Sequence, residues 1–142
     1  TDPNPHGARY CLRAAQQLGI PARWETAPAE ALPFPAASFR HVIATLAFCS
    51  VDDPAAALAE IRRVLEPGGS LHFLEHVAAE EGTKTRRRQR MARPLFRACL
   101  HCNPELETGA LIGRSGFSHV EYESFRLPIP IVGPHIAGRA VR

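Results

Sequence analysis

The sequence predicts an α/β fold in which a mostly parallel sheet is covered by helices on both faces. Two observations lead to this prediction. Apolar, β-branched segments alternate along the chain with segments whose apolar residues recur at helical spacing. The apolar segments are nearly continuous, which is typical of strands buried on both faces of a parallel sheet. The 142 residues suffice for one core, so we expect a single domain over residues 1–142.

The two helices of the N-terminal half begin alike. Asn4-Pro5 and Asp52-Asp53-Pro54 each place a capping side chain before a proline, which suits the first turn of a helix. The first helix is predicted over residues 6–18 and ends at Gly19. The second helix ends at Pro67-Gly68-Gly69. It carries an apolar stripe that consists of Ala57, Leu58, Ile61, Val64 and Leu65.

Two strands are predicted from apolar segments bounded by turn residues. Residues 39–48 contain only three polar side chains and are predicted to be a strand buried on both faces. Residues 70–77 form a second such strand. The other elements, in chain order, are a short strand at 23–26, an irregular proline-rich segment at 27–37, a helix at 85–102, a short helix at 105–115, and strands at 117–125 and 136–141.

The net charge of +3 arises from one segment, residues 84–97. This segment holds seven of the 17 basic residues and no acid, whereas the rest of the chain has 10 basic residues against 14 acidic ones. The distribution excludes a generally basic nucleic-acid coat protein, and no nucleic-acid-binding module surrounds the segment, so no nucleic-acid partner is predicted. Two interpretations stay open: a solvated helix that could steer an anionic substrate, or a surface that contacts an anionic partner. The basic residues are Lys84, Arg86, Arg87, Arg88, Arg90, Arg93 and Arg97.

The four cysteines are too few for a disulfide scaffold, so we expect free thiols in a reducing, cytoplasmic compartment. No apolar run approaches the roughly 20 residues of a membrane-spanning helix. Cys99-Leu100-His101-Cys102 has the residue types of a zinc site but lacks a second paired cluster. Cys11 and Cys49 are expected far away in other elements, and we therefore predict no metal site.

Candidate binding residues follow the predicted strands. In open α/β sheets, ligands bind beyond the carboxyl ends of the strands. The segments expected there are residues 2–4, 28–32 and 45–49 and the pair Glu75-His76. The Asp2 carboxylate offers two acceptor oxygens for the vicinal hydroxyls of a ribose, although aspartate is also common in ordinary turns. His76 beside Glu75 could accept a proton or orient a substrate, or the pair could only cap the strand and hydrogen-bond the next loop.

Several segments, taken in order, resemble class I S-adenosylmethionine-dependent methyltransferases. The matching segments are Pro28-Ala29-Glu30-Ala31-Leu32-Pro33-Phe34-Pro35, Ser38-Phe39, Val42-Ile43-Ala44, Ile61-Arg62-Arg63-Val64-Leu65-Glu66-Pro67-Gly68-Gly69 and Gly116-Phe117. Others resemble the branch of this family that includes thiol S-methyltransferases. They are Asp2-Pro3-Asn4-Pro5-His6, Cys49-Ser50-Val51, Glu75-His76-Val77 and Val132-Gly133-Pro134-His135-Ile136.

The resemblance implies a Rossmann-like fold with an antiparallel C-terminal hairpin, S-adenosylmethionine as cofactor, and methyl transfer to a small-molecule acceptor, with a thiol as candidate. A quinone or other lipid-like ring is the alternative acceptor, and a non-catalytic remnant that binds an anionic partner through residues 84–97 is the alternative function. The implied catalytic residues are Glu75 and His76, with His76 taking the thiol proton or orienting the acceptor.

The resemblance also implies a set of cofactor-binding residues. Asp2 would hold the ribose, with Pro3 beside the adenine and Asn4 in the same loop. A backbone N–H of Ala29 would reach the adenine edge, with Glu30 in that loop, and Thr45 and Leu46 would face the methionine part. The family often has aspartate at the position of Pro28, so the adenine amine would depend here on backbone groups and apolar packing.

One feature of the family is missing from the sequence. A glycine-rich loop should precede Asp2 by about 20 residues, and no residue precedes Thr1. We therefore expect a domain without its first βα unit, and weak or absent cofactor binding by the 142 residues alone. The abundance of arginine and alanine over lysine suggests a bacterial source.

Overall fold

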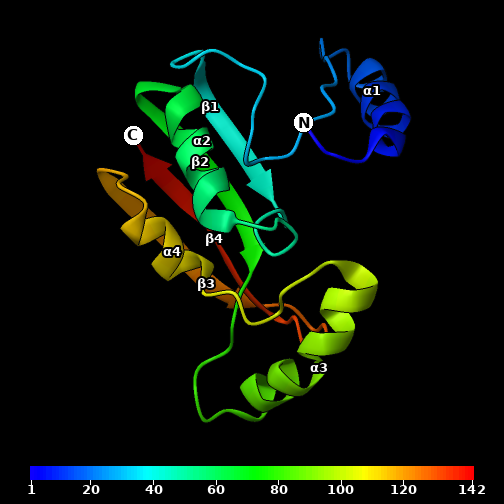
Figure 1. The fold of residues 1–142 in the computed structure, drawn as a ribbon, viewed down its shortest axis with the longest axis vertical. Helices are drawn as coiled ribbons and strands as arrows, with labels where there is room; N and C mark the ends of the chain where they lie inside the picture. Colours follow the sequence, from blue (N-terminus) through cyan, green and yellow to red (C-terminus); the bar gives the residue numbers. More distant parts are fainter.

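A four-stranded sheet with the strand order β1-β2-β4-β3 forms the centre of the computed structural model, which describes all of residues 1–142 (Figure 1). A 3-10 helix at Pro5–Gly7 precedes the first α-helix. The elements are α1 (Ala8–Gln17), β1 (Phe39–Thr45), α2 (Pro54–Val64), β2 (Leu65–His76), α3 (Lys84–Leu100), α4 (Thr108–Arg114), β3 (His119–Arg126) and β4 (Pro134–Val141). None of the helices combines the length and the apolar character needed to cross a bilayer.

The strand directions confirm the α/β fold class and the antiparallel C-terminal hairpin, but they change one detail. β1 and β2 are parallel, whereas β4 is antiparallel to both β2 and β3. One of the three pairings is therefore parallel, not most of them. The hairpin is antiparallel because only residues 127–133 join β3 to β4, and a parallel pair needs a longer crossover.

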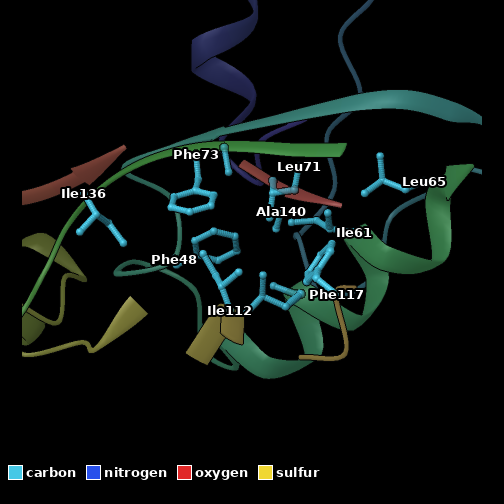
Figure 2. Packing of buried hydrophobic residues seen from close by; sticks show 12 residues of the cluster. Phe48, Ile61, Leu65, Leu71, Phe73, Ile112, Phe117, Ile136 and Ala140 are labelled. Atoms are coloured by element: carbon cyan, nitrogen blue, oxygen red, sulfur yellow. The ribbon is translucent and has the colours of Figure 1, made fainter. Parts of the chain in front are cut away.

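The core lies on one face of the sheet (Figure 2). Leu58 and Ile61 of α2 and Ile112 of α4 pack there against Leu71 and Phe73 of β2. All members of the predicted stripe are buried, four of them in α2, whereas Leu65 is the first residue of β2. The expectation of helices on both faces is not met, because α2 and α4 cover the same face and α1 lies to one side of the sheet (Figure 1).

β1 differs from its prediction as a strand buried on both faces. It ends at Thr45 and pairs only with β2, so it forms an edge of the sheet. Ala44 faces the core and is 7% exposed, whereas Ile43 points to the uncovered face and is 77% exposed. The apolar composition predicted burial correctly for one face only, because burial of the other face needs a covering layer that this chain does not place there.

The predicted short strand at residues 23–26 is also wrong. These residues have no regular structure, and the sheet ends at β1 without a further partner strand. The backbone N–H of Asp2 donates a 3.4 Å hydrogen bond to the Glu25 carbonyl, which joins this segment to the start of the chain. A strand is stable only where a neighbouring strand satisfies its backbone groups.

Candidate active site at the carboxyl ends of β1 and β2

The parallel strands β1 and β2 end at the same edge of the sheet, where Thr45 pairs with Leu74. Leu46 follows in the left-handed region at φ 51°, and its N–H donates to the Leu74 carbonyl at 2.9 Å. This conformation is unfavourable for leucine by roughly 1–2 kcal/mol, so the surrounding contacts must hold it. It redirects the chain so that residues 47–49 lie across the end of β2.

Glu75, near the end of β2, holds the turn after β1 in place through hydrogen bonds to its backbone. Its side chain is fully buried, and Oε1 accepts hydrogen bonds from the N–H of Ala47 at 2.9 Å and of Phe48 at 3.5 Å. Oε2 has no hydrogen-bond partner. Burial raises the pKa of the Glu75 carboxyl to about 7, against the opposing effect of the two backbone donors. Glu75 therefore positions the turn after β1.

His76 is buried at the last position of β2 and lies against a cysteine from another part of the chain. Its Nε2 is 3.1 Å from Cys102 Sγ, and its Nδ1 has no hydrogen-bond partner. Burial, with a smaller effect of His135, lowers the pKa of His76, so that its imidazole is neutral near pH 7. Burial and the neighbouring Cys49 raise the pKa of the Cys102 thiol to about 12.

Cys49, expected far from Cys102, lies next to it instead. The Sγ atoms of Cys49 and Cys102 and a ring nitrogen of His76 are all within 4.8 Å of one another. The segment after α3 returns to the turn after β1, where the Asn103 N–H donates to the Cys49 carbonyl at 2.7 Å. The cluster could not be predicted from the sequence, because Cys49 and His76 are 27 residues apart and His76 and Cys102 are 26 residues apart. No local spacing indicates that they are in contact.

A cavity of about 180 Å³ opens beside this cluster. Phe48 and Cys49 line it from the turn after β1, and Arg97 and His101 line it from the end of α3. The cavity therefore lies between the sheet edge and the basic helix, and it offers room for a small molecule next to Cys49.

The residues predicted to bind a cofactor fall into two groups. Thr45 and Leu46 belong to the sheet edge just described, and Glu30 is tied to the start of α2, where its Oε1 accepts from the N–H of Asp52 at 3.0 Å. The start of the chain, residues 2–4, lies instead just before α1 (Figure 1), and its hydrogen bonds stay within residues 2–25. The structure thus brings Thr45, Leu46, Glu75 and His76 together and leaves the Asp2 loop apart from them.

Comparison with known proteins identifies the family. Residues 1–73, about half of the chain, match the family described as Methyltransferase domain. The chain belongs to this methyltransferase family.

The relatives agree with this assignment. Thiol S-methyltransferase TMT1B from Homo sapiens is 36% identical to the chain, over 99% of this chain and 60% of that protein. The demethylmenaquinone methyltransferase of Thermus thermophilus is 40% identical over 49% of this chain and 32% of that protein. The structure of a SAM-dependent methyltransferase from Methanosarcina mazei superimposes with a TM-score of 0.70 at 17% identity, covering 99% of this chain and 79% of that one, which shows the shared Rossmann-like fold. The chain spans 60% of the length of the human relative.

Two of the residues predicted to bind S-adenosylmethionine, Asp2 and Ala29, have hydrogen-bonding groups without a partner in the protein. Asp2 is exposed, and only its Oδ1 is engaged, by the N–H of Asn4 at 2.7 Å. The N–H of Ala29 donates no hydrogen bond within the protein, and the Ala29 side chain packs against the core cluster. A free carboxylate oxygen suits a ribose hydroxyl, and a free N–H suits the adenine edge. Asp2 and Ala29 therefore each offer a group that suits the cofactor of the family, while the structure holds the Asp2 loop apart from Thr45 and Leu46.

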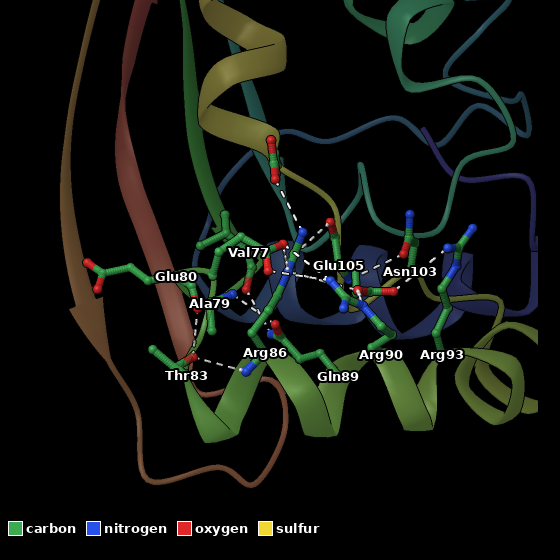
Figure 3. Close-up of polar contacts among 12 residues, drawn as sticks. Val77, Ala79, Glu80, Thr83, Arg86, Gln89, Arg90, Arg93, Asn103 and Glu105 are labelled. Atoms are coloured by element: carbon green, nitrogen blue, oxygen red, sulfur yellow. Dashed lines mark hydrogen bonds and ion pairs between the residues drawn. The ribbon is translucent and has the colours of Figure 1, made fainter.

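The basic helix α3 is docked and partly neutralised (Figure 3). Arg86 is 2.9 Å from Glu81 and 3.9 Å from Glu105, and Arg90 and Arg93 also pair with Glu105 at 3.6 and 3.7 Å. Buried Gln89 accepts from the Ala79 N–H at 2.8 Å and donates to the carbonyls of Val77 and Ile131, each at 3.0 Å. One face of the helix is thus fixed over the end of β2, and the interpretation as a fully solvated helix holds for the opposite face alone. The contacts of Gln89 could not be predicted from its place in a charged run.

Proposed function

We propose that the protein transfers a methyl group from S-adenosylmethionine to a small-molecule thiol. The observation that carries this proposal is the 36% identity to a thiol S-methyltransferase over 99% of the chain. The geometry adds support, because a small cavity and the neutral imidazole of His76 adjoin the sheet edge where ligands of open α/β sheets bind.

The proposed cofactor residues supply binding and alignment. Asp2, with Pro3 and Asn4, would hold the ribose and adenine end, Ala29 and Glu30 the adenine edge, and Thr45 and Leu46 the methionine end. When bound, S-adenosylmethionine supplies a methyl group on a positively charged sulfur, which is already a strong electrophile. The protein therefore needs mainly to align donor and acceptor for in-line attack.

His76 is the residue that we assign to the acceptor. A thiol attacks as its thiolate, so a group that removes or displaces the thiol proton accelerates the reaction. The His76 imidazole is neutral and one of its nitrogens has no partner, so it can accept a proton or orient the sulfur. Glu75 acts as a positioning residue, since its carboxylate holds the backbone of Ala47 and Phe48.

The cofactor assignment is tested by Asp2→Ala in the complete gene product. We expect S-adenosylmethionine affinity to fall roughly tenfold or more, because hydrogen bonds to a charged carboxylate are lost. Isothermal titration calorimetry measures the change, and Glu123→Ala, an exposed acid on β3, serves as the control. An unchanged affinity in Asp2→Ala contradicts the role of Asp2.

The acceptor is tested with a panel of small thiols and quinones, using mass spectrometry to detect the added methyl group. The similarity to a demethylmenaquinone methyltransferase makes a quinone-type ring the second candidate acceptor. Methylated thiols without methylated quinones support the thiol proposal. Methylated quinones alone overturn it in favour of the second candidate, and a protein that binds the cofactor but methylates neither class contradicts both.

A further inference from the structure

The cluster of Cys49, His76 and Cys102 brings together two thiols and an imidazole from three separate elements. Their ligand atoms lie within 4.8 Å of one another, and His76 Nε2 is 3.1 Å from Cys102 Sγ. Cys49 and His76 are 6% and 5% exposed, and Cys102 is half-buried. Thiolate sulfur and imidazole nitrogen are both ligands that suit zinc.

The backbone fixes each member of the cluster. The turn that carries Cys49 is held by Glu75 and by the left-handed Leu46, and the Cys49 carbonyl accepts from Asn103. Cys102 follows His101, which caps α3 in the left-handed conformation at φ 47°, and the Cys102 N–H donates to the Phe96 carbonyl at 3.2 Å. His76 is held at the end of β2 by its pairing with His135 of β4. The cluster is therefore preorganised.

Two further atoms beside the cluster are buried without a partner. His76 Nδ1 and Glu75 Oε2 make no hydrogen bond, although His76 is 5% exposed and Glu75 is fully buried. A buried polar atom without a partner costs about 1–3 kcal/mol, so such atoms are uncommon unless they serve a bound group. The protein therefore leaves polar atoms unsatisfied on His76, a member of the cluster, and on its chain neighbour Glu75.

We propose that Cys49, His76 and Cys102 bind a Zn²⁺ ion with an open fourth position. Two cysteine thiolates and one histidine form a donor set that zinc prefers, and three protein ligands with one open position are typical of catalytic zinc. Binding of the ion releases the two cysteine protons to solvent. The prediction of no metal site, which rested on Cys49 lying far from Cys102, is replaced by this proposal.

The open position would take the sulfur of the acceptor, and this half of the inference rests on the proposed function. With zinc bound, the ion replaces His76 in removing the thiol proton, and His76 serves as a ligand. A thiol that coordinates zinc loses its proton to solvent, which produces the nucleophile at neutral pH. The thiolate sulfur then forms a bond to the methyl carbon while the bond from that carbon to the donor sulfur breaks. The products are a thioether and neutral S-adenosylhomocysteine, and the released proton balances the charge. The cavity beside Cys49, lined also by Arg97 and His101, provides the entry path.

Metal analysis of the complete gene product, purified under reducing conditions without chelator, tests the site. We expect about one zinc ion per chain and, after exchange for Co²⁺, the near-ultraviolet charge-transfer band of cobalt thiolates with the visible bands of tetrahedral coordination. Cys49→Ser and Cys102→Ser should lose zinc and the thiolate bands. The control variants Cys11→Ser and Cys99→Ser should retain both, because these cysteines are exposed and outside the cluster.

The cobalt spectrum of the wild-type protein tests for the metal site even if a cluster variant fails to fold. Absence of the thiolate bands in reduced wild-type protein overturns the metal site, as does their persistence in folded Cys49→Ser and Cys102→Ser. A Cys49–Cys102 disulfide in place of bound metal, detected by thiol titration, also overturns it.

Addition of 2-mercaptoethanol to the cobalt protein tests the open position without any turnover. We expect the thiolate charge-transfer band to grow as a further sulfur enters the coordination sphere, and an unchanged spectrum contradicts thiol coordination. Zinc that binds while no thiol is methylated leaves the metal site intact and refutes the proposed function. Full thiol methylation by chelator-treated, metal-free protein refutes the catalytic role of zinc and leaves the proposed function intact.

Discussion

The 3-10 helix that leads directly into α1 begins with the same sequence signal as α2, but α1 and α2 have opposite relations to the rest of the molecule. Asn4 Oδ1 accepts from the His6 N–H at 3.0 Å ahead of α1, and Asp53 Oδ1 accepts from the N–H of Ala55 and Ala56 at 3.0 Å ahead of α2. Each cap is followed by proline. Yet α2 buries four residues against the sheet, whereas α1 buries none.

This difference separates two kinds of information in the sequence. Capping side chains and prolines decide where a helix begins, and they act within a few residues of the chain. An apolar stripe contributes to stability only where another element offers a surface for it, and in this chain α2 has that surface while α1 does not. Substitutions at matched positions of the two helices should therefore have very different effects.

The largest effect is expected for Leu58→Ala in α2. Leu58 is fully buried in the core cluster, so its truncation removes apolar contacts and leaves a cavity. The free energy of unfolding should fall by about 3 kcal/mol, which urea denaturation followed by circular dichroism measures. A loss below about 1 kcal/mol would show that α2 is not anchored to the sheet as described.

A smaller effect is expected from removal of the α2 cap by Asp53→Ala. The two backbone N–H groups that Asp53 Oδ1 satisfies lose their partner, and the free energy of unfolding should fall by about 1 kcal/mol. Asp52→Ala is the matched control, because the Asp52 side chain makes no capping bond. Equal losses in the two variants, measured by the same denaturation experiment, would contradict the assignment of the cap.

Local signals explain which parts of the fold the sequence predicted. The caps, the Gly19 stop and the apolar stripe of α2 act over a few residues, and the helices they predict are confirmed within a few residues. The predicted stop at Pro67-Gly68-Gly69 is wrong, because α2 ends at Val64 and these residues lie within β2. The apolar run of β1 predicted a strand but not its exposed face, and residues 23–26 lacked the partner strand that their composition required. Such errors arise because burial and strand pairing depend on distant parts of the chain.

The candidate site shows the same limit. Resemblance to the family pointed to Glu75 and His76 at a strand end, and the structure places them at the sheet edge with Thr45 and Leu46. Cys49 and Cys102 meet His76 only through the path of α3 and the segment after it, which no spacing rule describes. The roles of these residues, the cytoplasmic location and the bacterial source stay predictions.

A pH-dependent change in the free energy of unfolding is expected for Glu60→Gln in α2. Glu60 binds the guanidinium of Arg63 at 2.6 Å and the Leu32 N–H at 2.9 Å, and so joins the helix to the proline-rich segment that contains Ala29 and Glu30. The hydrogen bond from Arg63, followed by that from Leu32, holds the pKa of Glu60 below its usual 4.5.

A carboxyl whose pKa is lowered in the folded state stabilises the fold above its ordinary pKa, and this contribution is lost as the pH falls through the folded value. Glu60→Gln should therefore destabilise the protein by roughly 0.5 kcal/mol near pH 7, with the difference from wild type shrinking as the pH falls below 4.5. Denaturation curves recorded across this pH range measure it. A difference that is constant with pH would show that the charge of Glu60 contributes nothing.

The smallest effect is expected for Leu12→Ala in α1, the counterpart of Leu58→Ala. Leu12 is 40% exposed and belongs to a helix without buried residues, so its truncation removes little apolar contact. Alanine also has a slightly higher helix propensity than leucine, which offsets part of that loss. The free energy of unfolding should therefore change by less than about 0.5 kcal/mol in the 142-residue chain, as urea denaturation would measure. A loss comparable to that of Leu58→Ala would mean that the apolar face of α1 is packed against the protein in solution, and the contrast between the two helices would then be wrong.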